Sequence, residues 1–431
     1  MRGLLVRFAL KFNPMKLVRI GVINIGDELL LGQVIDSNSA RIGQFLAPLG
    51  LNVHRKWCVG DDAEEIKYAL TEAARTEEII LITGGLGPTR DDVTKKVLAE
   101  YFGVGMVFSE ENYAHLRNLL EPRNVPIREV HRQQCFMPAN ARLLENKMGT
   151  AMGMWMEHEG KIYIAMPGVP YEMDYIMIHG VLPGLKAKSY SSNMYHQTMH
   201  VGGMGETEIA AVIEPLLNKL PEYISLAYLP ALGTVRVRLT GNHENAALLK
   251  QQIDDYLNQM SASLGEKVFG FGDSSLEKAL GAMLLEKGLK LGTAESCTGG
   301  NIAHKITSVP GSSAYFMGGV ISYTNAVKKT MLNVKDQTLE NHGAVSEQTV
   351  REMVTGCCEA LNVDLAIAVS GIAGPDGGTD ELPVGTIFIA AGNADGILTR
   401  KLTLGKDRSR NIETASIYAL LLAREWILSP K

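Results

Sequence analysis

Apolar runs alternate with helix-patterned polar stretches in the first part of the chain. Three runs rich in β-branched residues predict strands: Val18–Ile25, Leu51–Val59 and Glu78–Thr83. Between them, Asp36-Ser37-Asn38 caps a helix that runs to about Leu49, and Asp61-Asp62 begins another that runs to about Arg75. This βαβ alternation predicts a parallel sheet with helices on both faces, and ligands bind beyond the C-terminal ends of such strands.

The same alternation continues to about residue 188 and then changes. Helical segments reach about Gln134, strands are expected at Met152–Trp155 and Ile162–Ala165, and the Pro167–Pro170 turn introduces another helix. From about Ser189 the pattern predicts a small α+β unit. Its expected strands are His196–Val201, Ile224–Tyr228 and Val235–Thr240, and its expected helices lie near Gly205–Leu220 and Glu244–Ala262.

A glycine-rich linker, Gly270–Asp273, precedes a third α/β unit. Its expected elements are a helix over Ser275–Lys287, a strand before Ser296, a strand over Gly318–Tyr323, a helix over Ser346–Leu361, strands over Leu365–Ser370 and Val384–Ala391, and a final helix to about Ile427. The expected organisation is therefore an extension over residues 1–14, a parallel-sheet α/β domain over 15–188, a small α+β insert over 189–270 and an α/β domain over 271–431.

Composition narrows the class of protein. The chain has 431 residues, of which 46% are hydrophobic and 21% charged, and its formal net charge is -5. This balance is typical of a globular protein and argues against nucleic-acid binding through a basic surface. No apolar run approaches the roughly 20 residues of a membrane span. Five cysteines without CxxC spacing favour reduced thiols in a cytoplasmic protein.

The N-terminal residues 1–14 are basic and mildly apolar. They lack the long apolar core and the small-residue cleavage site of a signal peptide. We interpret them as a leader or as the product of an upstream start, with Met1 and Met15 both open as the true first residue.

A glycine-rich turn, Thr83–Asp92, follows the third predicted strand. Its glycines allow backbone N–H groups to approach and cradle an anion. Asp91 and Asp92 are expected at the start of the next helix, where they cap it or hold a divalent cation, and Asp27 and Glu28 end the first strand at the same edge. A purely structural turn and cap is the alternative. The expected metal ligands are Asp27, Glu28, Asp91 and Asp92, and the expected substrate-binding residues are Gly84, Gly85, Gly87, Thr89 and Asn38.

These residues carry a resemblance to a known family. Gly26–Asn38, Thr83–Asp92 and Met166–Pro170 resemble the molybdopterin-binding fold of CinA-like competence/damage-inducible proteins, and the match covers nearly the whole chain from about residue 16. The resemblance implies hydrolysis of ADP-ribose to AMP and ribose 5-phosphate with a divalent metal. Clustered carboxylates favour Mg²⁺, Mn²⁺ or Co²⁺ over zinc. Molybdopterin binding is the alternative for this half.

A second glycine-rich turn, Ala294–Gly300, follows the apolar run Leu289–Thr293. A strand that ends in a small-residue turn and opens a helix presents Ser296 beside free N–H groups, which suits a nucleophile with an anion site. No Ser–His–Asp pattern is apparent, but Tyr323 and Lys328 follow another predicted strand. A buried lysine can lose its proton near neutrality and deprotonate a serine, while Tyr323 relays the proton or orients the pair.

Two further segments add binding groups to this third unit. The turn Ser370–Gly378 follows a strand and supplies further N–H groups, and Arg408 begins the last helix, where it can pair with a substrate phosphate. A serine in a turn is more often only a cap, and a lone lysine or tyrosine is more often on the surface. Three strand-end turns within one small unit favour the functional interpretation.

The C-terminal motifs also carry a resemblance. Five segments resemble the nicotinamide mononucleotide amidohydrolase domain of CinA: Ala294–Gly300, Gly311–Ala314, Gly319–Asn325, His342–Ser346 and Ser370–Gly378. The resemblance implies conversion of nicotinamide mononucleotide to nicotinate mononucleotide with release of ammonia and without a cofactor. The implied catalytic residues are Ser296 with Lys328 and Tyr323, and the implied substrate-binding residues are Thr298, Gly299, Gly300, Ser370, Gly371 and Arg408. One departure is Lys406, where family members often have glycine.

The leading hypothesis is a bifunctional pyridine-nucleotide salvage hydrolase with nicotinamide mononucleotide and ADP-ribose as its small-molecule partners. The alternative is a molybdopterin-binding or competence/DNA-damage regulatory module that has lost one or both activities. The resemblance favours a homodimer. The middle segment carries no obvious chemistry, so a spacer or dimerisation element is expected there.

Overall fold

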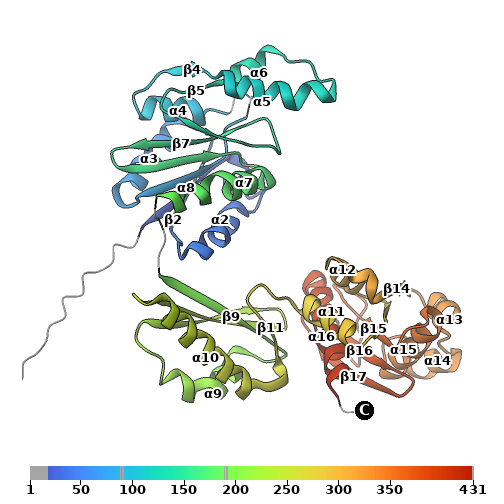
Figure 1. Ribbon diagram of the computed structural model, residues 1–431. Helices are drawn as coiled ribbons and strands as arrows, with labels where there is room; N and C mark the ends of the chain where they lie inside the picture. Colours follow the sequence, from blue (N-terminus) through green and yellow to red (C-terminus); the bar gives the residue numbers. More distant parts are fainter. Residues whose placement is uncertain (1–17, 88, 90–91, 189, 191–192, 430–431) are drawn as a thin grey trace, which may run out of the picture. The chain divides into compact units, whose positions relative to one another are not determined.

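The computed structural model describes residues 18–87, 89, 92–188, 190 and 193–429, and the chain divides into two compact units at Met194 and Tyr195. Figure 1 shows the elements coloured along the chain. The expected extension over residues 1–14 lies outside the described residues.

The first unit is built on a six-stranded sheet with the order β2-β1-β3-β8-β7-β6. Its strands are β1 (Ile20–Ile25), β2 (Val53–Val59), β3 (Ile79–Thr83), β6 (Arg142–Leu144), β7 (Gly153–His158) and β8 (Lys161–Met166). The first three and β8 run parallel, as the βαβ pattern predicts. β6 and β7 pair antiparallel, so the sheet is mixed. The physical reason is the tight Glu159-Gly160 turn, in which both residues have positive φ, because such a two-residue turn joins only antiparallel neighbours.

Helices cover both faces of this sheet (Figure 1). α3 (Ala63–Thr76) and α4 (Thr94–Tyr101) pack on one face around Leu70 and Val97. α2 (Asn38–Leu46), α7 (Pro170–Ile176) and α8 (Leu182–Ala187) pack on the other. The remaining helices are α1 (Asp27–Leu30), α5 (Glu110–Leu120) and α6 (Glu129–Gln134). The sequence pattern missed a two-stranded ribbon, β4 (Met106–Phe108) with β5 (Phe136–Pro138), because three-residue strands carry almost no periodicity.

The second unit begins with a four-stranded sheet of order β10-β11-β9-β12. Its elements are β9 (Met194–Gly202), α9 (Glu206–Leu217), β10 (Ile224–Ala231), β11 (Thr234–Asn242), α10 (Ala246–Leu264) and β12 (Val268–Phe271). The expected α+β pattern is thus present. The expected linker was partly wrong, since Gly270 and Phe271 belong to β12, which pairs antiparallel with β9.

The rest of the second unit is a five-stranded sheet of order β14-β13-β15-β16-β17. β13 (Leu291–Glu295) is central and parallel to both β14 (Phe316–Ile321) and β15 (Leu365–Gly371), whereas β16 (Thr386–Asn393) and β17 (Gly396–Thr403) are antiparallel. The sequence pattern missed β17. The helices are α11 (Leu276–Glu286), α12 (Asn301–Thr307), α13 (Asn325–Leu332), α14 (Asp336–His342), α15 (Glu347–Leu361) and α16 (Arg408–Leu428).

Two apolar cores flank this second sheet. One packs α11, α12 and α16 against the strands, and the other packs α13 and α15 against the opposite face. Because β13, β14 and β15 are parallel, their C-terminal ends meet at one edge, which brings together the segments that follow Glu295, Ile321 and Gly371. Within the described part of the chain, no helix is both long enough and apolar enough to span a bilayer.

Candidate active sites

A serine and a lysine meet at the edge where β13 and β14 end. Ser296 directly follows β13, and its backbone N–H donates to the carbonyl of Val369. Lys328 Nζ lies 3.0 Å from Ser296 Oγ and donates to the carbonyl of Ser322 at 2.7 Å. Both side chains are buried, Lys328 to 1% exposure. The structure therefore brings together the two groups that the sequence proposed as nucleophile and base.

The surroundings of Lys328 favour its neutral form. Burial lowers the pKa of the Lys328 ammonium below its ordinary value. No carboxylate forms an ion pair with it among the residues that the structure describes. Lys328 reaches Ser296 from the first turns of α13, which Thr324 caps by accepting the N–H of Val327. A lysine without a counter-charge and beside a serine hydroxyl is suited to accept that hydroxyl proton.

Tyr323 lies at the rim of the site. It lines the same cavity as Ser296, but its side chain is 57% exposed and its hydroxyl accepts a hydrogen bond of 3.1 Å from Arg408. Arg408 also donates to the carbonyl of Gly374 at 2.8 Å. The Tyr323 hydroxyl thus pairs with Arg408, and the structure records no bond from it to Ser296 or Lys328. This placement suits substrate contact better than proton relay.

The cavity at this edge has a volume of about 280 Å³. Of the expected binding residues it includes Ser370, Gly371 and Arg408, and the Ser370 hydroxyl donates to the carbonyl of Ala344 at 2.7 Å. Several lining residues were not predicted from the sequence, among them Asn325, Asp376 and Cys297. Burial raises the pKa of the Cys297 thiol to about 12, so this neighbour of Ser296 stays protonated and is a poor nucleophile.

The prediction that the turn after Ser296 offers free N–H groups to an anion is wrong in part. Glu295 is almost completely buried, and its carboxylate accepts the N–H groups of Gly300, Ile302 and Ala303 at 2.8–3.1 Å. The N–H of Gly299 donates to the carbonyl of Ser296. The Glu295 carboxylate therefore occupies the N–H groups at the start of α12 and offsets the positive end of the helix dipole, so these groups are not free to bind a substrate anion.

The expected binding residues Thr298, Gly299 and Gly300 do not line the cavity. Thr298 is buried, and its hydroxyl has no partner among the described residues. Gly299 and Gly300 both adopt positive φ, so they shape the backbone of the turn that carries Ser296.

The glycine-rich loop of the first unit packs tightly at the end of β3. Gly84 has φ of 106°, its N–H donates to the carbonyl of Met166, and a Cβ there would lie 2.1 Å from the carbonyl oxygen of Ile25. Only glycine fits such an approach. A Cβ on Gly85 would meet the hydroxyl of Thr94 at the same distance.

Asp92 closes this loop and does not cap the next helix. Its carboxylate accepts the N–H groups of Gly87 and Thr89, each at 2.8 Å. α4 begins two residues later, and no side chain caps it. Capping, one of the two roles expected for Asp92, is thus wrong, because both carboxylate oxygens bond to loop N–H groups instead. Asp91 lies outside the described residues.

A cavity of about 510 Å³ lies against the loop. The expected site residues Gly84, Gly85, Gly87, Asp92 and Glu28 line it, together with Asp61 and Glu172, for which the sequence suggested no role in a site. Asn38 lies in a smaller neighbouring cavity of about 80 Å³ that also includes Glu28. Its side-chain amide donates to the carbonyl of Gly168 at 2.8 Å.

The described carboxylates do not form a ready metal site. The Asp27 carboxylate accepts the N–H of Asp61 at 3.2 Å, and both oxygens of Asp92 are engaged by the loop. Across the described ranges, no three His, Cys, Asp or Glu residues are grouped so that they could hold a metal ion. Because the predicted ligand Asp91 lies outside the described residues, the described donors alone do not make up the predicted cation site.

Glu172 stands out among the groups that the sequence analysis missed. It is 9% exposed, and its carboxylate accepts a 2.6 Å hydrogen bond from the fully buried Asn146 amide. Burial raises the pKa of the Glu172 carboxyl. A Cβ on Gly149 would lie 2.1 Å from Glu172 Oε2, so a side chain there would displace the Glu172 carboxylate. The only feature of the sequence that points to a site near Glu172 is the Pro167–Pro170 turn just before it.

Comparison with known proteins places the chain in a family. Three family models match: a probable molybdopterin binding domain over residues 21–187, the damage-inducible protein CinA KH domain over 196–293 and the CinA C-terminal domain over 273–427. A CinA-like protein of Cytophaga hutchinsonii is 40% identical over 410 residues, which cover 95% of this chain and 98% of the relative. The chain belongs to the CinA-like family.

Another relative agrees with this assignment. A putative competence-damage inducible protein of Caldicellulosiruptor bescii is 37% identical over 407 residues, which cover 94% of this chain and 98% of the relative. Among solved structures, the competence/damage inducible protein CihA of Agrobacterium tumefaciens is 38% identical, covers 35% of this chain and 93% of its own, and has a TM-score of 0.34.

Proposed function

We propose that this CinA-like protein deamidates nicotinamide mononucleotide at the Ser296–Lys328 pair. The observation that carries the proposal is the 3.0 Å separation of Ser296 Oγ and Lys328 Nζ inside a cavity, with burial lowering the lysine pKa. A neutral amine beside a serine hydroxyl supplies the adjacent general base that activates a serine nucleophile.

The residues divide the reaction into two steps. The Lys328 amine accepts the Ser296 proton while Oγ bonds to the carboxamide carbon, and Lys328 then returns the proton to the departing nitrogen, which leaves as ammonia. Water repeats the sequence on the serine ester with Lys328 again as base, and this step releases the nicotinate carboxylate and restores the serine. In this proposal Arg408, which donates to Tyr323 and Gly374 at the rim, pairs with the substrate phosphate.

The test is product formation by purified protein. Wild type should convert nicotinamide mononucleotide to nicotinate mononucleotide and ammonia in equal amounts, and Ser296→Ala should form neither. Undiminished ammonia release by Ser296→Ala would remove Ser296 as nucleophile. The expected homodimer belongs to the same proposal, and light scattering tests it.

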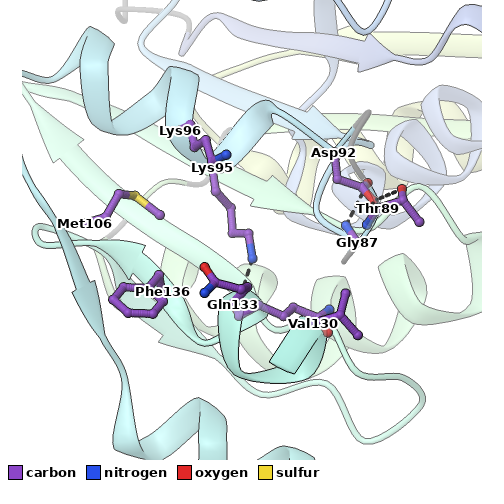
Figure 2. A pocket seen from close by; sticks show the side chains of 10 residues that line it. Gly87, Thr89, Asp92, Lys95, Lys96, Met106, Val130, Gln133 and Phe136 are labelled. Carbon is purple, nitrogen blue, oxygen red and sulfur yellow. Dashed lines mark hydrogen bonds between the residues drawn. The ribbon is translucent and has the colours of Figure 1, made fainter. Parts of the chain in front are cut away.

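For the first unit we propose hydrolysis of ADP-ribose to AMP and ribose 5-phosphate. The supporting observation is that Gly87 and Asp92 of the glycine loop line both the 510 Å³ cavity and a second cavity of about 440 Å³ around Lys95 (Figure 2), which leaves room on either side of the loop for the two halves of the substrate. Incubation with ADP-ribose and Mg²⁺, Mn²⁺ or Co²⁺ should yield both products. The competing function is molybdopterin binding, because the family model that matches residues 21–187 is described as a probable molybdopterin binding domain. Protein that carries a fluorescent pterin and forms no AMP would favour that alternative.

A further inference from the structure

A cavity of about 550 Å³ lies in the second unit and belongs to neither candidate active site. It is bounded by the turn of the β10–β11 hairpin, by the segment between β17 and α16, and by the first three turns of α16. Its lining residues are Ala231, Leu232, Gly233, Leu404, Gly405, Lys406, Asp407, Arg410, Asn411, Thr414 and Tyr418. The volume lies within the roughly 300–1,000 Å³ of small-molecule sites, which are frequent where two substructures meet.

Close packing fixes the two sides of this cavity to each other. Gly233, in the hairpin turn, has φ of 64°, and a Cβ there would lie 3.0 Å from Cγ2 of Ile417 on α16. Two turns farther along α16, Arg424 donates a 2.8 Å hydrogen bond to the carbonyl of Val268 at the start of β12. The four-stranded sheet and α16 are thus in direct contact, and the cavity is a recess between them.

Two cations without a counter-charge line the cavity. Lys406 and Arg410 form no ion pair within the described ranges of the chain, and neither side chain donates a hydrogen bond there. The one carboxylate in the lining, that of Asp407, accepts the N–H of Arg410 at 2.6 Å and caps α16. The start of the helix is therefore already capped, and the two side-chain cations are the groups that can hold an anion.

A buried amide supplies a different kind of group. Asn411 is 1% exposed, and its nitrogen donates to the carbonyls of Ala373 and Gly405 at 3.0 and 2.9 Å. Its side-chain oxygen accepts no hydrogen bond in the described part of the chain and is not closed off from solvent. An amide oxygen with open lone pairs accepts the proton of a hydroxyl. The cavity thus combines cations for an anion with an acceptor for a hydroxyl group.

The segment between β17 and α16 separates this cavity from the 280 Å³ cavity around Ser296. The carbonyl oxygen of Lys406 lies on the side of Gly374, where a Cβ would be 3.0 Å away, and Gly374 and Arg408 line the 280 Å³ cavity. The two cavities share no lining residue. A molecule in the 550 Å³ cavity therefore occupies a site of its own.

We propose that the 550 Å³ cavity binds a sugar phosphate, with Lys406 and Arg410 on the phosphate and the side-chain oxygen of Asn411 on a sugar hydroxyl. A guanidinium group pairs with phosphate through two parallel N–H groups, and an ammonium adds a point charge. Tyr418 is the one aromatic residue in the lining, so polar groups and not stacked rings dominate recognition. This assignment depends on neither of the two hydrolytic reactions proposed above.

The experiment is calorimetric titration of the full-length protein with ribose 5-phosphate at low ionic strength. Lys406→Gln and Arg410→Gln should each weaken binding by about tenfold, because each removes a charge-assisted hydrogen bond. Lys401→Gln is the matched control, since this exposed lysine on β17 lies over the Phe388 ring outside the cavity. Arg408→Gln is the second control, because it removes the cation of the 280 Å³ cavity. Both controls should keep the wild-type affinity, and circular dichroism verifies that each variant is folded.

The outcomes decide both parts of the assignment. Weaker binding in Lys406→Gln and Arg410→Gln, with wild-type affinity in the two controls, supports the site. Unchanged affinity in the first two variants, or a loss confined to Arg408→Gln, overturns it, and so does an equal loss in all four. Inorganic phosphate should bind more weakly than ribose 5-phosphate, and equal affinity would overturn the role of the sugar. Absence of binding to wild type at millimolar concentration overturns the site, whatever the protein hydrolyses.

Discussion

Replacing Lys328 by methionine isolates the role of the amine at the second-unit site. Methionine keeps the length and apolar stem of lysine but removes Nζ, and with it the bonds to Ser296 Oγ and to the Ser322 carbonyl. General base catalysis by a positioned side chain contributes about 10²–10⁴-fold. We therefore expect kcat for ammonia release to fall by about 10²–10⁴-fold, equivalent to about 2.7–5.4 kcal/mol of transition-state stabilisation.

The same substitution should leave the fold intact. Two hydrogen bonds at about 1 kcal/mol each are lost, and this loss is offset because a desolvated amine is replaced by an apolar group. We expect the free energy of unfolding to change by less than about 2 kcal/mol. Lys329→Met is the matched control, because Lys329 is exposed on the same helix and pairs with Asp336 at 2.8 Å.

The assay is continuous ammonia detection at saturating nicotinamide mononucleotide, together with urea unfolding of each variant. If folded Lys328→Met retains activity within about tenfold of wild type, Lys328 is not the base and the reasoning fails. Equal losses in Lys328→Met and Lys329→Met would also refute it, since they would point to a general disturbance of α13.

Three further measurements test the two proposed sites. The rate of ammonia release should rise with pH through a pKa below the ordinary lysine value, because Lys328 acts when deprotonated and burial lowers its pKa; a pH-rate profile without this limb contradicts the mechanism. Glu295→Gln should lower the free energy of unfolding by about 2–3 kcal/mol, because charge-assisted bonds to three N–H groups are lost, and urea unfolding measures it. ADP-ribose hydrolysis should stop with a chelator while ammonia release continues, and loss of both activities would show that the two sites are not independent.

Much of the second-unit site could be predicted from the sequence because its parts are local. A β-branched run followed by a small-residue turn and a helix places Ser296 at a strand end whatever the partners of the strand are. The relation of Ser296 to Lys328 required one further step, that two parallel strands end at the same edge. The sequence placed Lys328 at the end of a strand, whereas the structure places it in α13. Helix α13 was not recognised because its N-cap, Thr324, follows the end of β14 by only three residues.

The parts that could not be predicted depend on which way a side chain turns. Glu295 directly precedes Ser296, and no local sequence feature shows that its carboxylate accepts the N–H groups at the start of α12. A substrate anion was expected at that position. Asp92 likewise turns back to the loop. The cavity around Lys95 is formed by pairing of β4 with β5, 30 residues apart, so Phe136 and Lys95 carry no common sequence signal.

The most direct test of the Ser296–Lys328 account is mass analysis of protein that is acid-quenched during turnover of nicotinamide mononucleotide. The account predicts a nicotinoyl-nucleotide ester on the peptide that contains Ser296, and no adduct in Ser296→Ala. An adduct on a different residue, or full turnover by Ser296→Ala, would contradict it.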